Sequence, residues 1–139
     1  MTFNLENKLD IHELLGRAAL GYDERDTEML VDCFIEEAQM TMCIAGGDLI
    51  GPFIGRGDIM TLMTDSMASQ TDVRRHVVSN IIFLNTSEQS ASVISSLTLL
   101  ATENGVTNLL SAGLYRDEVV NAEGGWKIAK RHLDLDTSY

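Results

Sequence analysis

The sequence predicts an α+β domain, because helical patterns fill its first half and strand patterns its second half. In the first half, apolar residues recur at three- and four-residue steps. In the second half, long alternating segments are joined by short breaks, which is typical of an antiparallel meander. Helices packed on one face of such a strongly curved sheet would make a cone, with a pocket between the helices and the concave face.

The first elements are predicted to be two helices. Apolar spacing favours a helix over residues 5–21, ended by Gly21. The residues that set this spacing are Leu5, Leu9, His12, Leu15 and Ala19. A second helix is expected over residues 27–34, with Asp26 as its N-cap.

Strand signals begin in the segment 38–44, and Gly46-Gly47 can turn the chain back into a strand over residues 49–54. A short helix is expected next, over residues 58–67. Four further strands are predicted over residues 73–86, 90–103, 107–120 and 126–136.

The length of 139 residues predicts one domain, residues 1–139. The chain has 10 Lys and Arg against 21 Asp and Glu, and its net charge of −11 argues against nucleic acid or an anionic membrane as partner. No apolar run is long enough to span a bilayer, and no export signal is recognisable, so a cytoplasmic location is expected. Cys33 and Cys43 are interpreted as small buried apolar residues.

His76 is the first candidate for chemistry, because histidine is the natural general base near neutral pH. Alternation along its strand would place His76, Val78, Asn80 and Ile82 on one face. Polar side chains on an otherwise apolar face need partners, so this face is either a functional site or a polar pair within the core.

Asp23 and Arg131 are the charged candidates. Asp23 follows Tyr22 just beyond the first predicted helix, and an Asp beside a His can orient the imidazole and stabilise its charged form. The first helix would lie over the concave face, so Asp23 could reach His76. Arg131 could bind an anion or a developing oxyanion if it points into the pocket. From these residues alone, a loop or capping role for Asp23 and a surface role for Arg131 are the more common outcomes and stay open.

Motifs for cofactors are missing from the sequence. It contains no glycine-rich phosphate loop and no metal-binding spacing of histidines, and neither cysteine has a histidine nearby. The sequence therefore predicts no metal and no cofactor, and either a reaction that needs proton transfer alone or no reaction.

Three motifs then carry a resemblance: Gly-Tyr-Asp-Glu-Arg-Asp at 21–26, Arg-His-Val-Val-Ser-Asn at 75–80 and Gly-Trp-Lys-Ile-Ala-Lys-Arg at 125–131. Together they resemble the SnoaL-like branch of the nuclear-transport-factor-2-like superfamily, and are similar to scytalone dehydratases and to hexachlorocyclohexane dehydrochlorinase. The resemblance covers nearly the whole chain and implies the cone-shaped fold.

The resemblance also implies roles for four residues. Asp23 and His76 match a dyad whose His abstracts a proton from carbon. Arg131 matches a residue that stabilises the leaving group, and Tyr22 matches a tyrosine that holds a water or carbonyl oxygen. The chain departs from these families at Met40, where the dehydrochlorinase has a tryptophan, and it lacks a match for a second histidine and a second tyrosine of scytalone dehydratase.

The favoured interpretation is a cofactor-independent lyase of the dehydratase type, acting on a small apolar cyclic or aromatic substrate. The expected binding residues are Met40, Met42, Val78, Asn80 and Tyr115. An isomerase and a non-catalytic ligand-binding protein stay open.

The segments 76–80 and 126–136 also resemble the β subunit of aromatic-ring-hydroxylating dioxygenases, which has a mainly structural role. A homo-oligomer, dimer or trimer, is expected in the superfamily, with Trp126 and Ile128 as candidate contacts on the outer sheet face.

Overall fold

The computed structural model describes residues 2–139. Its elements are α1 (Leu5–Asp23), α2 (Thr27–Asp32), β1 (Phe34–Ile44), β2 (Ile50–Ile54), α3 (Arg56–Ser69), β3 (Val73–Thr86), β4 (Ser90–Glu103), β5 (Val106–Ala122) and β6 (Gly125–Leu135). The α+β prediction is confirmed. Among residues 2–139, no helix combines the length and apolar character needed to cross a bilayer.

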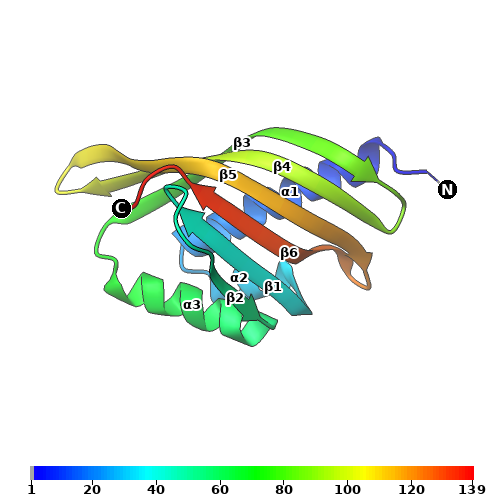
Figure 1. Ribbon diagram of the computed structural model, residues 1–139, viewed down its shortest axis with the longest axis horizontal. Helices are drawn as coiled ribbons and strands as arrows, with labels where there is room; N and C mark the ends of the chain where they lie inside the picture. Colours follow the sequence, from blue (N-terminus) through cyan, green and yellow to red (C-terminus); the bar gives the residue numbers. More distant parts are fainter. Residues whose placement is uncertain (1) are drawn as a thin grey trace.

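All six strands form one curved, open sheet in the order β2-β1-β6-β5-β4-β3 (Figure 1). Strands β3 to β6 make the predicted antiparallel meander. The chain's first strand, β1, lies parallel to its last, β6, and antiparallel to β2. Helix α1 packs against β3 and β6, and α3 against β1 and β2, so the helices cover one face of the sheet. This arrangement confirms the cone-shaped fold.

Helix α1 does not end at Gly21 but continues to Asp23. A Cβ atom on Gly21 would lie 3.0 Å from the backbone N of Leu30, so the glycine is needed for close packing of α1 against α2. Asp26 caps α2 as predicted, since its side chain accepts a hydrogen bond from the Met29 N–H at 3.1 Å.

The buried stripe of α1 differs from the predicted one. It consists of Ile11, Leu14, Leu15 and Ala18. Leu5, Leu9 and His12 are exposed instead. Both stripes have helical spacing, and periodicity alone does not decide which one meets a sheet.

Helix α2 is shorter than predicted, because Phe34 already begins β1 and is fully buried opposite Ile128. The pairing of β1 with β6 is irregular between Phe34 and Gln39. Strand alternation is lost there, which is why the sequence pattern placed the start of this strand at residue 38.

A β-bulge interrupts β3. Asn80 has a left-handed backbone, with φ of 51°, and the pairing with β4 shifts between Ser79 and Ile82. The faces therefore exchange after the bulge: Ile81 packs against the core and Ile82 is 56% exposed. The prediction that His76, Asn80 and Ile82 share a face is wrong for this reason.

A second irregularity lies in β6, where the pairing with β5 shifts at Ile128 to Lys130 and leaves Ala129 as the extra residue. Trp126 and Ile128 consequently face the core on the same side as Arg131. They are buried within their own chain, so the expectation that they form an oligomer contact is wrong.

Candidate functional site

A cavity of about 180 Å³ lies between the helices and the concave face of the sheet. The predicted site residues that line it are Tyr22, Met40, Met42, His76, Tyr115 and Arg131. Apolar side chains of α1, α3 and β6, among them Leu62, Met63 and Leu133, complete most of the wall. The site residues therefore converge from α1, β1, β3, β5 and β6.

Two predicted binding residues lie elsewhere. Val78 is partly buried and packs into the core, but it does not line the cavity. Asn80 is exposed because of the bulge, and its side-chain amide donates a hydrogen bond to Ser96 at 3.3 Å. Neither residue is placed to touch a ligand in the cavity.

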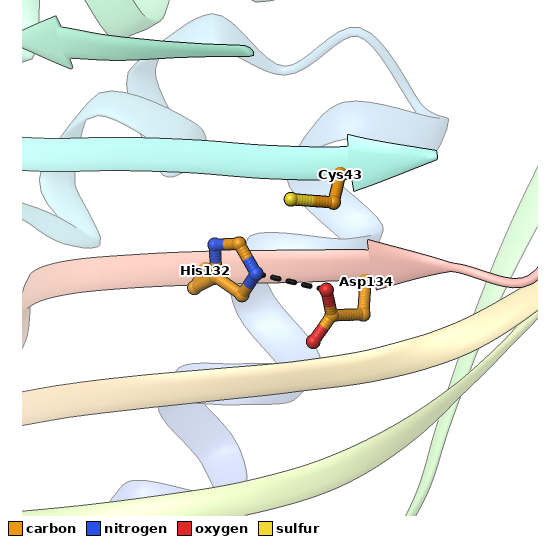
Figure 2. A group of neighbouring side chains, drawn as sticks. All are labelled: Cys43, His132 and Asp134. Carbon is orange, nitrogen blue, oxygen red and sulfur yellow. Dashed lines mark hydrogen bonds and ion pairs between the residues drawn. The ribbon is translucent and has the colours of Figure 1, made fainter. Parts of the chain in front are cut away.

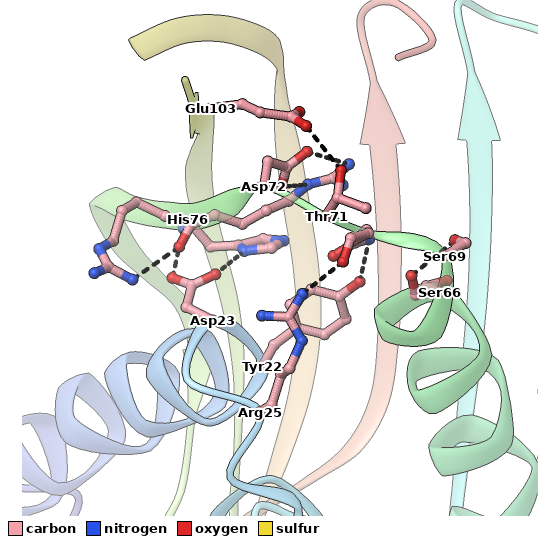
Figure 3. Close-up of polar contacts among 12 residues, drawn as sticks. Tyr22, Asp23, Arg25, Ser66, Ser69, Thr71, Asp72, His76 and Glu103 are labelled. Atoms are coloured by element: carbon pink, nitrogen blue, oxygen red, sulfur yellow. Dashed lines mark hydrogen bonds and ion pairs between the residues drawn. The ribbon is translucent and has the colours of Figure 1, made fainter. Parts of the chain in front are cut away.

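Asp23 holds His76 at two points (Figure 3). One carboxylate oxygen accepts a hydrogen bond from the backbone N–H of His76 at 2.8 Å, and the other lies 2.5 Å from Nδ1 of its ring. Asp23 is only 6% exposed, in the last turn of α1, and not beyond the helix as the sequence suggested. An ionised carboxylate only accepts, so Nδ1 carries a hydrogen, and in the neutral imidazole Nε2 then has the free lone pair.

Nε2 lies on the edge of the ring turned away from Asp23 (Figure 3). His76 lines the cavity, and among residues 2–139 no side chain or backbone group forms a hydrogen bond with Nε2. The base nitrogen is thus available to a ligand, and the geometry fixes the tautomer that a general base requires.

Tyr22 packs beside this dyad. Its ring meets the His76 ring edge-on, with the centroids 4.9 Å apart. The Tyr22 hydroxyl accepts a hydrogen bond from the side chain of Gln70 at 2.6 Å. Burial raises the pKa of Tyr22, so the hydroxyl stays protonated and retains a hydrogen to donate.

Gln70 belongs to the connection between α3 and β3, and hydrogen bonds tie this connection down beside the dyad. Its next residue, Thr71, is labelled in Figure 3. The carbonyl of Gln70 accepts from Arg25 at 2.9 Å, and Thr71 donates to Glu103 at 2.9 Å. These contacts fix the segment from which Gln70 reaches Tyr22.

Arg131 is paired with Asp117, a residue that sequence reasoning missed. Nε and Nη2 of Arg131 donate to the two carboxylate oxygens at 2.8 and 3.0 Å, and both residues are buried. Burial alone would lower the pKa of Arg131, but the Asp117 carboxylate outweighs it and raises that pKa above its ordinary value. The guanidinium is therefore always charged and its charge is balanced. The alternation of Tyr115, Asp117 and Val119 could have revealed the inward-facing carboxylate.

Tyr115 lies against this ion pair, with the guanidinium of Arg131 3.9 Å from the centre of its ring. Burial raises the pKa of Tyr115 to about 12, although the nearby Arg131 acts in the opposite direction. Its hydroxyl has no hydrogen-bond partner within the part of the chain that the structure describes. A ligand in the cavity could use it as a donor.

The sequence model of the SnoaL-like domain matches residues 4–132, which is most of the chain. The chain belongs to the SnoaL-like family. This SnoaL-like domain thus belongs to the family that the three motifs predict. No curated protein matches its sequence.

Solved structures share the fold of this SnoaL-like domain at low identity. A protein of unknown function from Nostoc punctiforme with a cystatin-like fold is 20% identical, with a TM-score of 0.82, covering 98% of this chain and 96% of its own. A proposed scytalone dehydratase from Novosphingobium aromaticivorans is 24% identical, with a TM-score of 0.78 and coverage of 95% and 85%. The β subunit of a proposed aromatic-ring-hydroxylating dioxygenase from the same organism is 17% identical, with a TM-score of 0.79 and coverage of 93% and 88%. At such identities the likeness shows the fold and no activity.

Proposed function

We propose that this SnoaL-like domain is a cofactor-independent lyase, in which His76 removes a proton from carbon in a small cyclic or aromatic substrate. The observation that carries the proposal is the two-point contact of Asp23 with His76, which leaves Nε2 directed away from Asp23 in a residue of the cavity wall. A buried carboxylate that holds Nδ1–H and directs Nε2 outward is the arrangement that a general base uses.

In the first step, Nε2 of neutral His76 takes a proton from a carbon next to a carbonyl group. The ring becomes positively charged while its Nδ1–H is bound to Asp23, so the buried carboxylate stabilises the imidazolium. His76 can then return this proton to the leaving group, which completes an elimination.

The substrate also needs hydrogen-bond donors near its carbonyl oxygen, because negative charge develops on this oxygen when the proton leaves the neighbouring carbon. The hydroxyl groups of Tyr115 and Tyr22 remain protonated, because burial raises the pKa of both. Nη1 of Arg131 forms no hydrogen bond within residues 2–139 and adds a third candidate donor.

The charge balance favours a neutral substrate. Arg131 is the charged group that the sequence analysis assigned to an anion, but Asp117 already neutralises it. Apolar side chains such as Met40 and Met63 contribute much of the remaining wall. A cyclic ketone or hydroxy-ketone fits this combination of apolar wall and hydrogen-bond donors better than a carboxylate does.

Proton abstraction can be tested before the natural substrate is known. Cyclohexanone and tetralone would be incubated with the protein in D₂O, and exchange of their α-hydrogens followed by NMR. We expect faster exchange with the wild-type chain than with the His76→Ala variant. Equal exchange by both proteins, with either ketone, would remove His76 from the role of base.

The β-subunit alternative rests on the fold shared with such a subunit. It gives no reason for a cavity lined by an oriented histidine, so the lyase is preferred. A ligand-binding protein without turnover would bind these ketones equally well with and without His76, and would catalyse no exchange.

We also propose that the chain forms a homo-oligomer, through a surface that does not include the buried Trp126 and Ile128. Exposed apolar side chains of Val77, Ile82 and Leu84 lie on the outer side of β3 and could be covered by a second copy. Light scattering coupled to size-exclusion chromatography would give the mass, and a monomer at all concentrations would refute this part.

A further inference from the structure

Outside the cavity, the structure brings together three side chains of the kinds that bind transition metals (Figure 2). One ligand atom from each of Cys43, His132 and Asp134 lies within 4.8 Å of the other two. The sequence predicted no metal site, because no histidine is near either cysteine along the chain. Parallel pairing of β1 with β6 supplies this proximity, since it places Cys43 opposite Asp134.

The cluster lies on the outer face of the sheet. Met42 and Leu133 line the cavity, and side chains alternate along a strand, so Cys43, His132 and Asp134 face away from it. All three are partly buried, which leaves them accessible to an ion from solvent. This group is therefore separate from the Asp23–His76 site.

Further side chains already orient two of the three groups. Thr41 Oγ1 lies 2.6 Å from Nδ1 of His132, which leaves Nε2 on the side of Asp134, 2.9 Å from its Oδ1. The other oxygen of Asp134, Oδ2, lies 3.7 Å from Nε of Arg116. Outer contacts of this type position the ligands in metal sites, and the Thr41 hydroxyl, which both donates and accepts, can hold His132 in either tautomer.

We propose that Cys43, His132 and Asp134 bind a divalent transition-metal ion, with Zn²⁺ as the best match, and that water completes the coordination. A thiolate, an imidazole and a carboxylate form a ligand set typical of zinc. Mg²⁺ and Ca²⁺ prefer oxygen ligands throughout. In the metal-free chain the Asp134 carboxylate accepts the Nε2–H of His132, so coordination moves this hydrogen to Nδ1, which then donates to Thr41. Coordination also releases the thiol proton of Cys43 to solvent.

The bound ion would join β1 to β6, which are the first and last strands of the chain and the parallel pair of the sheet. It should therefore raise the midpoint of thermal unfolding, because it binds the folded chain more tightly than the unfolded one.

The test uses the full chain freed of metal with a chelator, to which ZnCl₂ is added in a calorimeter and CoCl₂ in a spectrophotometer. We expect saturation at one ion per chain, and with cobalt a thiolate-to-metal absorption band together with the visible bands of tetrahedral Co²⁺. The substitutions Cys43→Ser and Asp134→Asn each remove a direct ligand, so each should weaken Zn²⁺ binding by about 100-fold or more, beyond the roughly 10- to 100-fold that loss of an outer-shell partner costs.

Asp136→Asn provides the matched control, since Asp136 is an exposed aspartate two residues further along the chain. It should bind like the wild-type chain. Absence of binding to the wild-type chain at micromolar Zn²⁺ would overturn the proposal, as would a cobalt spectrum without the thiolate band. Binding that is unchanged in both Cys43→Ser and Asp134→Asn would also overturn it. The wild-type spectrum decides the matter even where a variant does not fold.

Discussion

Asp117 and Arg131 face each other on adjacent strands, in direct register, and join through two hydrogen bonds between buried groups. The pair puts a permanent guanidinium in the wall of the cavity without giving the cavity a net charge. Nη1 of Arg131 can still donate a hydrogen bond into the cavity. Because Asp117 balances the charge, Arg131 offers a ligand a hydrogen-bond donor and does not attract anions. The selectivity of the cavity should therefore depend on Asp117, which need not touch the ligand.

Replacing Asp117 by Asn should make the cavity attract anions. The variant leaves the charge of Arg131 unbalanced, at a cost of about 3–5 kcal/mol in the free energy of unfolding. Benzoate should then bind at least about tenfold more tightly to the variant than to the wild-type chain, and should restore part of the lost stability. Calorimetry and thermal unfolding with benzoate measure both effects. The double variant Asp117→Asn, Arg131→Gln has no unpaired charge, so a gain in benzoate affinity there would contradict the explanation.

The Asp23→Asn variant should lose catalysis while keeping its fold. Two donors of His76, its backbone N–H and Nδ1–H, point at the carboxylate, but an asparagine offers one acceptor and one NH₂ group. The ring relieves the conflict by moving its hydrogen to Nε2, which removes the base. We expect α-hydrogen exchange to fall by roughly 100-fold or more, with about 1–3 kcal/mol lost in stability. Glu24→Gln, on the exposed neighbour, is the control and should change neither quantity.

The stability of the chain should fall at high pH through Tyr115. Burial raises its pKa from 10.0 to about 12, so the folded chain keeps a proton that the unfolded chain loses. The contribution is complete below pH 10.0 and is lost as the pH rises toward about 12. The free energy of unfolding, measured with urea at a series of pH values, should decrease by on the order of 1 kcal/mol per pH unit in this window. Tyr115→Phe should have a shallower slope, and an identical slope in both proteins would contradict the assignment.

Gly113 should tolerate no side chain. A Cβ atom there would lie 2.1 Å from the carbonyl oxygen of Asp134, which is backbone and cannot move without separating β5 from β6. Gly113→Ala is expected to destabilise the fold by about 3 kcal/mol or more, within the range of overpacked cores. Gly16, in the exposed middle of α1, has open space around it. Gly16→Ala should raise the free energy of unfolding by about 0.5–1 kcal/mol. Chemical denaturation of the two variants would show the opposite signs.

Much of the architecture was accessible from the sequence because the long strands alternate and the turns contain glycine or polar residues. The strands β3 and β4 have the predicted bounds, 73–86 and 90–103. The contact of Asp23 with His76 also agrees with the motif-based prediction, since a helix that lies over the concave face brings its last turn to the start of β3.

The two errors in assigning strand faces have a common physical origin. Periodicity assigns faces by counting, and one extra residue at Asn80 or Ala129 reverses the count for the residues that follow it. The parallel contact between β1 and β6 was missed for a different reason. It joins segments about ninety residues apart, for instance Thr41 and His132, which are separated by 91 positions, and no local pattern indicates such a pairing.

The bulge at Asn80 also affects how related sequences can be aligned. A relative whose strand lacks the extra residue must be aligned with a one-residue gap at this position, and a gap placed after residue 82 would assign Ile81 and Ile82 to the wrong sides of the sheet. Positions between the bulge and the misplaced gap would be misassigned in such an alignment, even where its score is high. Structure-based superposition of β3 and β4 should therefore precede any transfer of ligand-contacting positions across this segment.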